Sequence, residues 1–155
     1  MDLAHLLQQL ATSLGVDALE LNEHGVLSLE FDETVTLHLE PDPHTDECHL
    51  YTTLCRIPED DGARLTLFSA ILAANGFGRG TFGAAFGVDE QAREVILARI
   101  FRPARTEAED LRQWISELVS AVNIWRQRIP ELGGDERSAL PIDEPPAGFL
   151  HMLRA

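Results

Sequence analysis

Residues 25–39 read GVLSLEFDETVTLHL, and this stretch decides the fold. It holds two runs in which apolar and polar side chains alternate, from Val26 to Phe31 and from Val35 to Leu39, with Asp32-Glu33 between them. Side chains of a strand alternate between its faces, so the runs predict antiparallel strands with one buried and one polar face. Residues 49–57 predict a third strand.

Apolar spacings of three and four predict helices around this sheet. The first helix carries five leucines at such spacings: Leu3, Leu6, Leu7, Leu10 and Leu14. A second helix is expected over residues 63–75, two more strands over 81–88 and 94–101, and a long helix from a Thr106 cap with Glu109 to Pro130. The predicted class is α+β: helix, antiparallel three-strand sheet, helix, two further strands and a long C-terminal helix.

The domain organisation follows from the change of composition near residue 130. Residues 1–130 are expected to form a single α+β domain. Residues 131–155 contain Gly133-Gly134 and three prolines and end on an apolar stretch, Phe149 to Leu153. They are expected to form a C-terminal tail that is either flexible or docked.

The net charge of −14 is unevenly placed. Residues 1–62 hold 14 acids and one base, Arg56, whereas the remainder is nearly balanced. A negative field repels phosphate backbones and anionic lipids, so nucleic acid and membranes are poor partners, and a polypeptide suits it better. Every basic residue is arginine, which excludes mechanisms that need a lysine.

The expected compartment is the cytoplasm. The N-terminus carries no positive leader region, and no apolar run approaches the ~20 residues of a membrane span. Cys48 and Cys55 lie seven residues apart in one expected strand, which predicts opposite faces and two free thiols.

The sequence offers little for catalysis. Residues 78–83 fit the pattern G-x-G-x-x-G, but a helix is expected before them and a strand after them, the reverse of a dinucleotide site. His38, His44, Cys48 and His49 lack the paired spacing of a zinc site. We therefore expect no enzyme activity, no cofactor and no metal.

The order of these elements resembles the CesT (Tir chaperone) family, the class I chaperones of bacterial type III secretion, over about residues 1–129. Five segments carry the resemblance: Leu3-x-x-Leu6-Leu7-x-x-Leu10, the Gly25 to Phe31 strand, Leu72-x-x-Asn75, the Gly83 to Asp89 strand and Leu118-x-x-x-Val122-x-x-Trp125.

This resemblance implies a homodimer that binds the N-terminal segment of one or more secreted effectors and keeps it soluble and non-globular for delivery to the secretion apparatus. The residues expected to contact the effector are Leu7, Leu10, Leu27, Leu29 and Phe31. Those expected at the dimer interface are Leu67, Ile71, Phe82 and Phe86. For each of them, packing in the chain's own core is the competing interpretation.

Two other functions remain open at this point. A regulatory or adaptor protein on the same scaffold would bind a folded partner and control secretion or transcription. A small enzyme of unknown type is the third alternative.

Overall fold

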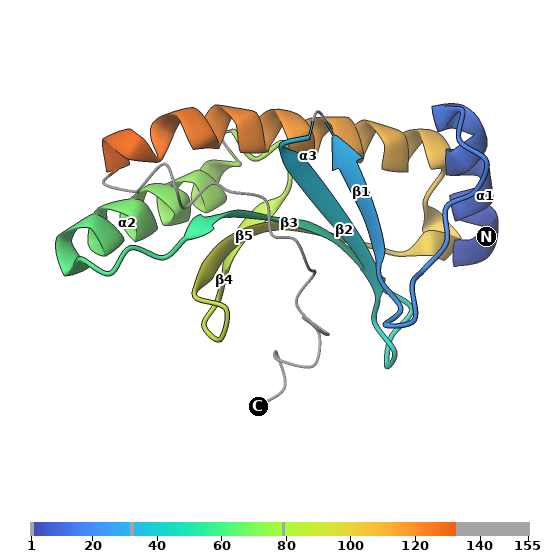
Figure 1. Cartoon of the computed structure of the whole chain (residues 1–155), viewed down its shortest axis with the longest axis horizontal. Coiled ribbons are helices and arrows are strands. Elements are labelled where there is room, and N and C mark those ends of the chain that lie inside the picture. Colours follow the sequence, from blue (N-terminus) through green and yellow to red (C-terminus); the bar gives the residue numbers. More distant parts are fainter. Residues whose placement is uncertain (1, 32, 79, 133–155) are drawn as a thin grey trace.

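The computed structural model describes residues 2–31, 33–78 and 80–132, and its fold is the α+β class that the sequence predicts (Figure 1). The elements are α1 (Leu3–Leu14), β1 (Leu27–Phe31), β2 (Val35–Pro41), β3 (Cys48–Arg56), α2 (Asp61–Phe77), β4 (Ala85–Asp89), β5 (Glu94–Phe101), η1 (Pro103–Arg105), α3 (Ala108–Arg128) and η2 (Pro130–Leu132). The tail expected at 131–155 lies outside the described residues after position 132.

The five strands form one antiparallel sheet in the order β1-β2-β3-β5-β4. The sequence predicted three strands and then two more, and it is the pairing of β3 with β5 that joins them. All three α-helices lie on the same side of the sheet (Figure 1). We call the side away from the helices the open face.

The core fills the space between the helices and the sheet. Leu6 and Leu10 of α1 are 0% exposed and belong to one buried cluster that also contains strand residues such as Leu37 and Leu50 and Trp125 of α3. Asp2 caps α1 by accepting a hydrogen bond from the backbone N–H of His5 at 2.8 Å. The helix expected from the leucine spacing is therefore present, and its apolar stripe faces inward.

Two boundaries differ from the sequence prediction. The strand expected from residue 81 begins at Ala85, because residues 81–83 form a turn in which Phe82 has a positive φ of 50°. The long helix is capped by Glu107 with Asp110, not by Thr106 with Glu109. The hydroxyl of Thr106 instead donates to the carbonyl of Arg102 at 2.8 Å.

A β-bulge in β3 corrects the prediction for the two cysteines. The pairing of β3 with β5 shifts register between Thr53 and Cys55, so that Cys55 pairs with Val95. The extra residue returns Cys55 to the helix side of the sheet, where Cys48 also lies, and both thiols are free and buried in the same core. Simple alternation predicted opposite faces because it assumes an unbroken strand.

Candidate functional site

A pocket of about 760 Å³ lies between α1 and the irregular segment 17–21, and we call it the α1 pocket. Its apolar lining is Leu3, Ala4, Leu7, Ala11, Ala18, Leu19 and Leu21, and its polar lining is Gln8, Thr12, Asp17 and Glu20. The pocket is thus an apolar hollow with acidic groups beside it. Such a surface accepts an apolar side chain next to a basic one.

The local sequence explains why the chain folds back over α1. Gly15 ends the helix in the left-handed conformation, with φ of 71°, and its N–H bonds back to the last turn. At the far side, the side chain of Asn22 accepts hydrogen bonds from the N–H groups of His24 and Val26, at 2.9 and 3.0 Å. These two turns hold residues 17–21 against α1. Leu19 and Leu21 flank Glu20 in an alternating pattern that is typical of a strand, but this segment is not a strand.

The structure brings one of the predicted contact residues to this pocket. Leu7 lines it, whereas Leu10 is 0% exposed in the core. Leu27 is buried, and Leu29 and Phe31 are partly buried against the same core. Contact of a partner with Leu10 would require the fold to open, and Leu7 is itself only 4% exposed. The more accessible leucines of the pocket wall are the half-buried Leu3, Leu19 and Leu21.

Strand β1 lies at one edge of the sheet. It pairs with β2 on one side, and within the described residues no strand pairs with its other side. Unpaired backbone groups at an edge are a template for an added strand. An extended peptide could therefore meet both an apolar pocket and a row of backbone hydrogen-bonding groups.

Helix α2 carries a separate apolar surface. Leu65 is 69% exposed and Leu72 is 67% exposed, and their spacing of seven places them on one side of the helix. We call them the α2 stripe. Of the residues predicted for the dimer interface, Leu67, Ile71 and Phe86 are buried in the core of the single chain.

Phe82 is the one predicted interface residue with a large exposed fraction, 44%. Its turn is held by Arg99, whose guanidinium donates to the carbonyl of Phe82 and pairs with Glu117 at 3.3 Å. The same guanidinium lies 4.9 Å from the ring of Trp114. The turn is therefore tied to α3 and presents Phe82 outward.

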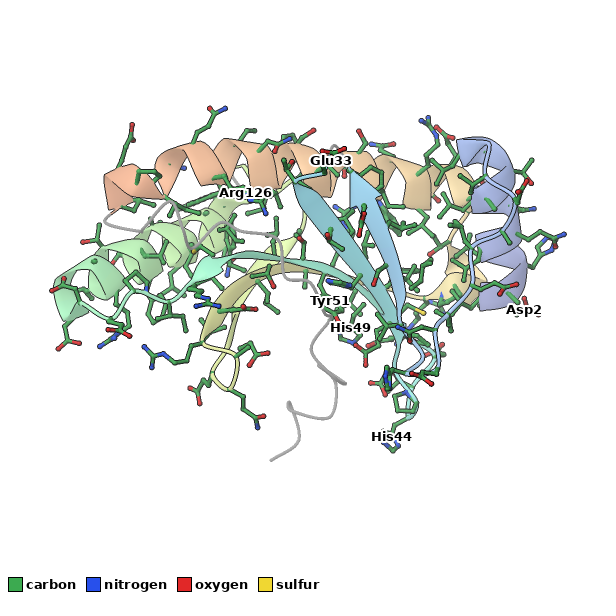
Figure 2. All side chains as sticks on the ribbon, viewed as in Figure 1. Asp2, Glu33, His44, His49, Tyr51 and Arg126 are labelled. Carbon is green, nitrogen blue, oxygen red and sulfur yellow. The ribbon has the colours of Figure 1, made fainter. Side chains whose placement is uncertain are left out.

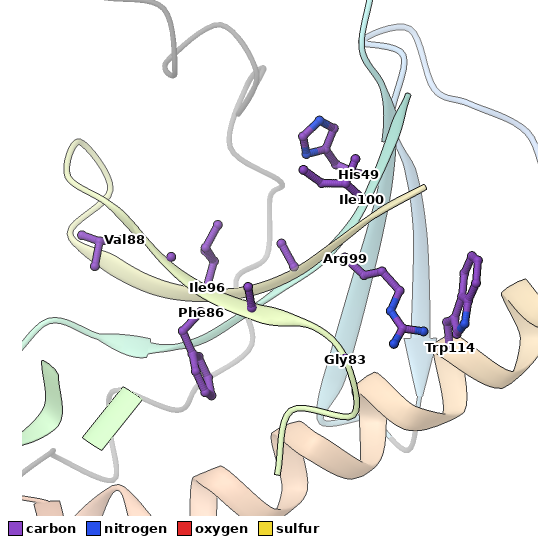
Figure 3. Close-up of a pocket in the computed structure, with 11 residues that line it drawn as sticks. His49, Gly83, Phe86, Val88, Ile96, Arg99, Ile100 and Trp114 are labelled. Atoms are coloured by element: carbon purple, nitrogen blue, oxygen red, sulfur yellow. The ribbon is translucent and has the colours of Figure 1, made fainter. Parts of the chain in front are cut away.

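A second pocket, of about 660 Å³, lies where the open face meets the start of β4, and we call it the open-face pocket (Figure 3). Its lining includes His49, Ile96 and Ile100, which lie on the side of the sheet away from α3, while Phe86 points toward the helices (Figure 3). Sequence reasoning did not find this pocket, because it depends on the non-local pairing of β3 with β5.

The structure bears on the metal, dinucleotide and membrane patterns within the described residues. In these residues, no three His, Cys, Asp or Glu side chains are grouped so as to hold a metal ion. The glycine-rich segment 78–83 joins α2 to β4, so a helix precedes it and a strand follows it. None of the described helices is long and apolar enough to cross a bilayer.

Comparison with solved structures places this fold among proteins crystallised with partners. The first, a structure of the HopA1-SchA chaperone-effector complex, matches with a TM-score of 0.65 and 21% identity, covering 79% of this chain and 91% of that one. The ExsC-ExsE complex matches with a TM-score of 0.64 and 25% identity, covering 93% and 100%. The Yersinia pestis type III secretion chaperone SycH, in complex with a fragment of YscM2, matches with a TM-score of 0.61 and 21% identity, covering 78% and 97%.

No curated protein sequence matches the chain. A family model matches residues 5–126, which span α1 through most of α3. That match includes most of the α1 pocket, from Leu7 onward, and all of the edge strand β1 and the α2 stripe. The chain therefore belongs to the Tir chaperone protein (CesT) family.

Proposed function

We propose that this protein is a type III secretion chaperone of the bacterial cytoplasm. It binds the N-terminal segment of one or more secreted effectors, keeps that segment soluble and non-globular, and promotes its delivery to the secretion apparatus. It acts as a homodimer and without catalysis. Family membership supports this proposal, as do solved structures of the same fold that contain a chaperone with an effector.

The observation that carries the proposal is the α1 pocket beside the edge of β1. An unfolded peptide has apolar side chains to bury and backbone groups to pair, and this region offers places for both. Each large apolar side chain that enters the pocket gains about 1.5–3 kcal/mol from burial. The backbone hydrogen bonds do not depend on the sequence of the bound peptide. The protein is therefore expected to select a peptide only by the spacing of its apolar anchor residues.

Charge supports a polypeptide partner and explains solubility. Asp17 and Glu20 stand beside the apolar wall of Leu3, Leu7 and Leu19. Acids beside apolar patches limit self-association of the free protein and attract a basic segment.

The proposed homodimer uses the α2 stripe. Two large exposed leucines on one side of a helix are an unusual surface for a monomer and suit a self-complementary interface. Phe82 lies on a turn that is rigidly tied to α3 and adds an aromatic contact to the proposed interface.

The test is the mass of the protein in solution, measured by light scattering, with and without the N-terminal ~100 residues of an effector encoded nearby. We expect a dimer alone and two chaperones per effector segment in the complex. The bound segment should become protease-resistant while gaining no independent globular structure. Binding only to a folded partner, with no effect on an unfolded segment, would favour the adaptor function and contradict this proposal.

A further inference from the structure

The open face of the sheet has a buried part and an exposed part. His38 is 4% exposed, Tyr51 is 1% exposed and Ile96 is 5% exposed. Tyr51 and Ile96 form a small cluster of strand residues separate from the main core. Figure 2 shows Tyr51 and His49 on the side of the sheet away from α3, where no helix of the described residues packs.

Polar groups on this face are removed from water together. The hydroxyl of Tyr51 donates to Glu40 at 3.2 Å, and the ring of His38 lies 5.3 Å from that of Tyr51. Burial lowers the pKa of His38 to about 4 and raises the pKa of Tyr51. A sheet face without a second layer is ordinarily accessible to water, as Ile100 on this face is at 57% exposed, so the open face offers an accessible apolar surface beside these buried groups.

The chain itself contains a suitable layer. The described residues end at Leu132, in η2, which packs against α2 and the core. Between Leu132 and Phe149 an extended chain spans up to roughly 60 Å, and β3 is only roughly 30 Å long. The C-terminal residues can therefore reach any point on the open face.

The composition of the end of the chain matches this surface. Residues 149–154 read FLHMLR, with four large apolar side chains, one histidine, one arginine and no acid. The open face presents Ile96 and Ile100 together with the carboxyl groups of Glu40 and Glu94. Pro145 and Pro146 favour the extended conformation that lets a segment lie along a sheet.

We propose that residues 145–154 cover the open face of their own chain, with apolar side chains from 149–153 in the open-face pocket. This inference goes beyond the proposed function, which concerns a foreign segment at the α1 pocket and the edge of β1. The open face is then covered by residues 145–154 of the same chain. An effector, or a second copy of the protein, would have to displace these residues in order to bind there.

The first experiment tests proximity in the full-length protein. Ile100→Cys with Leu150→Cys places one thiol in the open-face pocket and one in the segment, while Cys48 and Cys55 stay buried. The matched control is Leu65→Cys with Leu150→Cys, because Leu65 is as accessible as Ile100, at 69% against 57% exposed, and lies on α2. Under mild oxidation, we expect at least fivefold more intrachain disulfide for the Ile100 pair.

Equal yields for the two pairs would show a segment without a preferred position and would overturn the proposal. A mixture of the two single-cysteine variants, Ile100→Cys and Leu150→Cys, gives the other decisive outcome. This mixture can form the disulfide only between chains, so a yield as high as that of the double variant would place the segment on a second copy and would equally overturn docking on its own chain. No effector takes part, so the result is independent of the proposed function.

The second experiment tests burial. Phe149→Ser with Leu150→Ser should uncover the open face and raise the rate at which diethyl pyrocarbonate modifies His49, now 7% exposed, severalfold. Glu136→Ser with Arg137→Ser changes the same tail without removing apolar groups and should leave that rate unchanged. An unaltered rate in a folded Phe149→Ser, Leu150→Ser protein would contradict the proposal.

Discussion

The side chain of Asn75 is bound to the backbone of Phe86 by two hydrogen bonds. Its amide nitrogen donates to the carbonyl of Phe86 at 3.1 Å, and its oxygen accepts from the N–H of Phe86 at 2.8 Å. Asn75 thus satisfies both backbone groups of one residue in the edge strand β4. This pairing joins the last turns of α2 to the sheet and gives a structural reason for the Leu72-x-x-Asn75 pattern.

Asn75→Ala should lower the free energy of unfolding by about 1–3 kcal/mol, because two part-buried backbone groups lose their partner. Asn123→Ala, an exposed position on α3, is the matched control and should change stability by less than about 0.5 kcal/mol. Urea unfolding measures both. Equal effects would mean that the Asn75 bonds add nothing to the helix–strand contact.

Gly80→Ala should be more destabilising than Gly25→Ala. Both glycines have a positive φ, 75° and 77°, so both alanines carry a similar backbone cost of about 1–2 kcal/mol. Only at Gly80 would the added Cβ meet a neighbour, Nε1 of Trp125 at 3.3 Å, and the carbonyl of Gly80 also accepts the indole hydrogen bond. Thermal unfolding should show a clearly lower Tm for Gly80→Ala. Identical Tm values would show that Trp125 adjusts without cost.

Protonation of His38 should destabilise the fold. Its folded pKa is lowered from 6.5 to about 4 by burial, so the unfolded chain binds the proton more tightly. The stability that comes from keeping His38 neutral is therefore fully present above about pH 6.5. It is lost as the pH falls toward 4, and the free energy of unfolding decreases by at most about 3 kcal/mol. His38→Gln should flatten this part of the stability–pH curve. Glu94, whose raised pKa gives the opposite slope, is present in both proteins and cancels in the comparison. An unchanged slope would show that His38 is not the titrating group.

Ala4→Glu should block the α1 pocket while sparing the fold. Ala4 is exposed and lines the pocket, so a carboxylate there would be buried without a partner when an effector anchor enters. We expect effector affinity to fall at least tenfold, about 1.4 kcal/mol, with unfolding stability nearly unchanged. Gln9→Glu adds the same charge to the same helix away from the pocket and should retain affinity. Equal losses in the two variants would indicate a general charge effect.

Leu65→Asp with Leu72→Asp should convert the proposed dimer to a monomer. Both side chains are exposed within one chain, so the change should leave the monomer folded, while two charges in an apolar interface prevent association. Ile124→Asp, at an exposed aliphatic residue of α3 with 42% exposure, is the control and should leave the mass unchanged. Light scattering reads both. A persistent dimer in the double variant would place the interface elsewhere.

The parts of the fold that could be predicted from the sequence are single helices and strands, because each has an apolar pattern among residues close in the chain. The leucines of α1 and the alternation of β1 and β2 each report on residues close in sequence, and the structure confirms those elements. The pairing of β3 with β5 joins residues some 50 positions apart, such as Cys48 and Phe101, and no local pattern reports it. The single sheet and its open-face pocket were therefore beyond prediction.

The candidate site was predicted in part for a related reason. Spacing identifies an apolar stripe but does not say which of its members also lines a pocket, so Leu10 and Leu7 could not be told apart from the sequence. The α1 pocket also needs Leu19 and Leu21, which lie in an irregular segment without a period. Gly15 followed by two leucines before a turn at Asn22 was the available signal that the chain folds back on the helix.

The bulge in β3 makes the two cysteines natural probes of how often the core opens. Because it turns Cys55 to the same interior as Cys48, both sulfurs are protonated and shielded, with pKa values raised to about 12 and about 11 by burial. Thiolate is the reactive species, so the folded protein resists alkylation and oxidation. Each cysteine reacts only when the sheet separates from its helices, and the rate of thiol labelling therefore reports how often the native core opens, with no probe added to the chain.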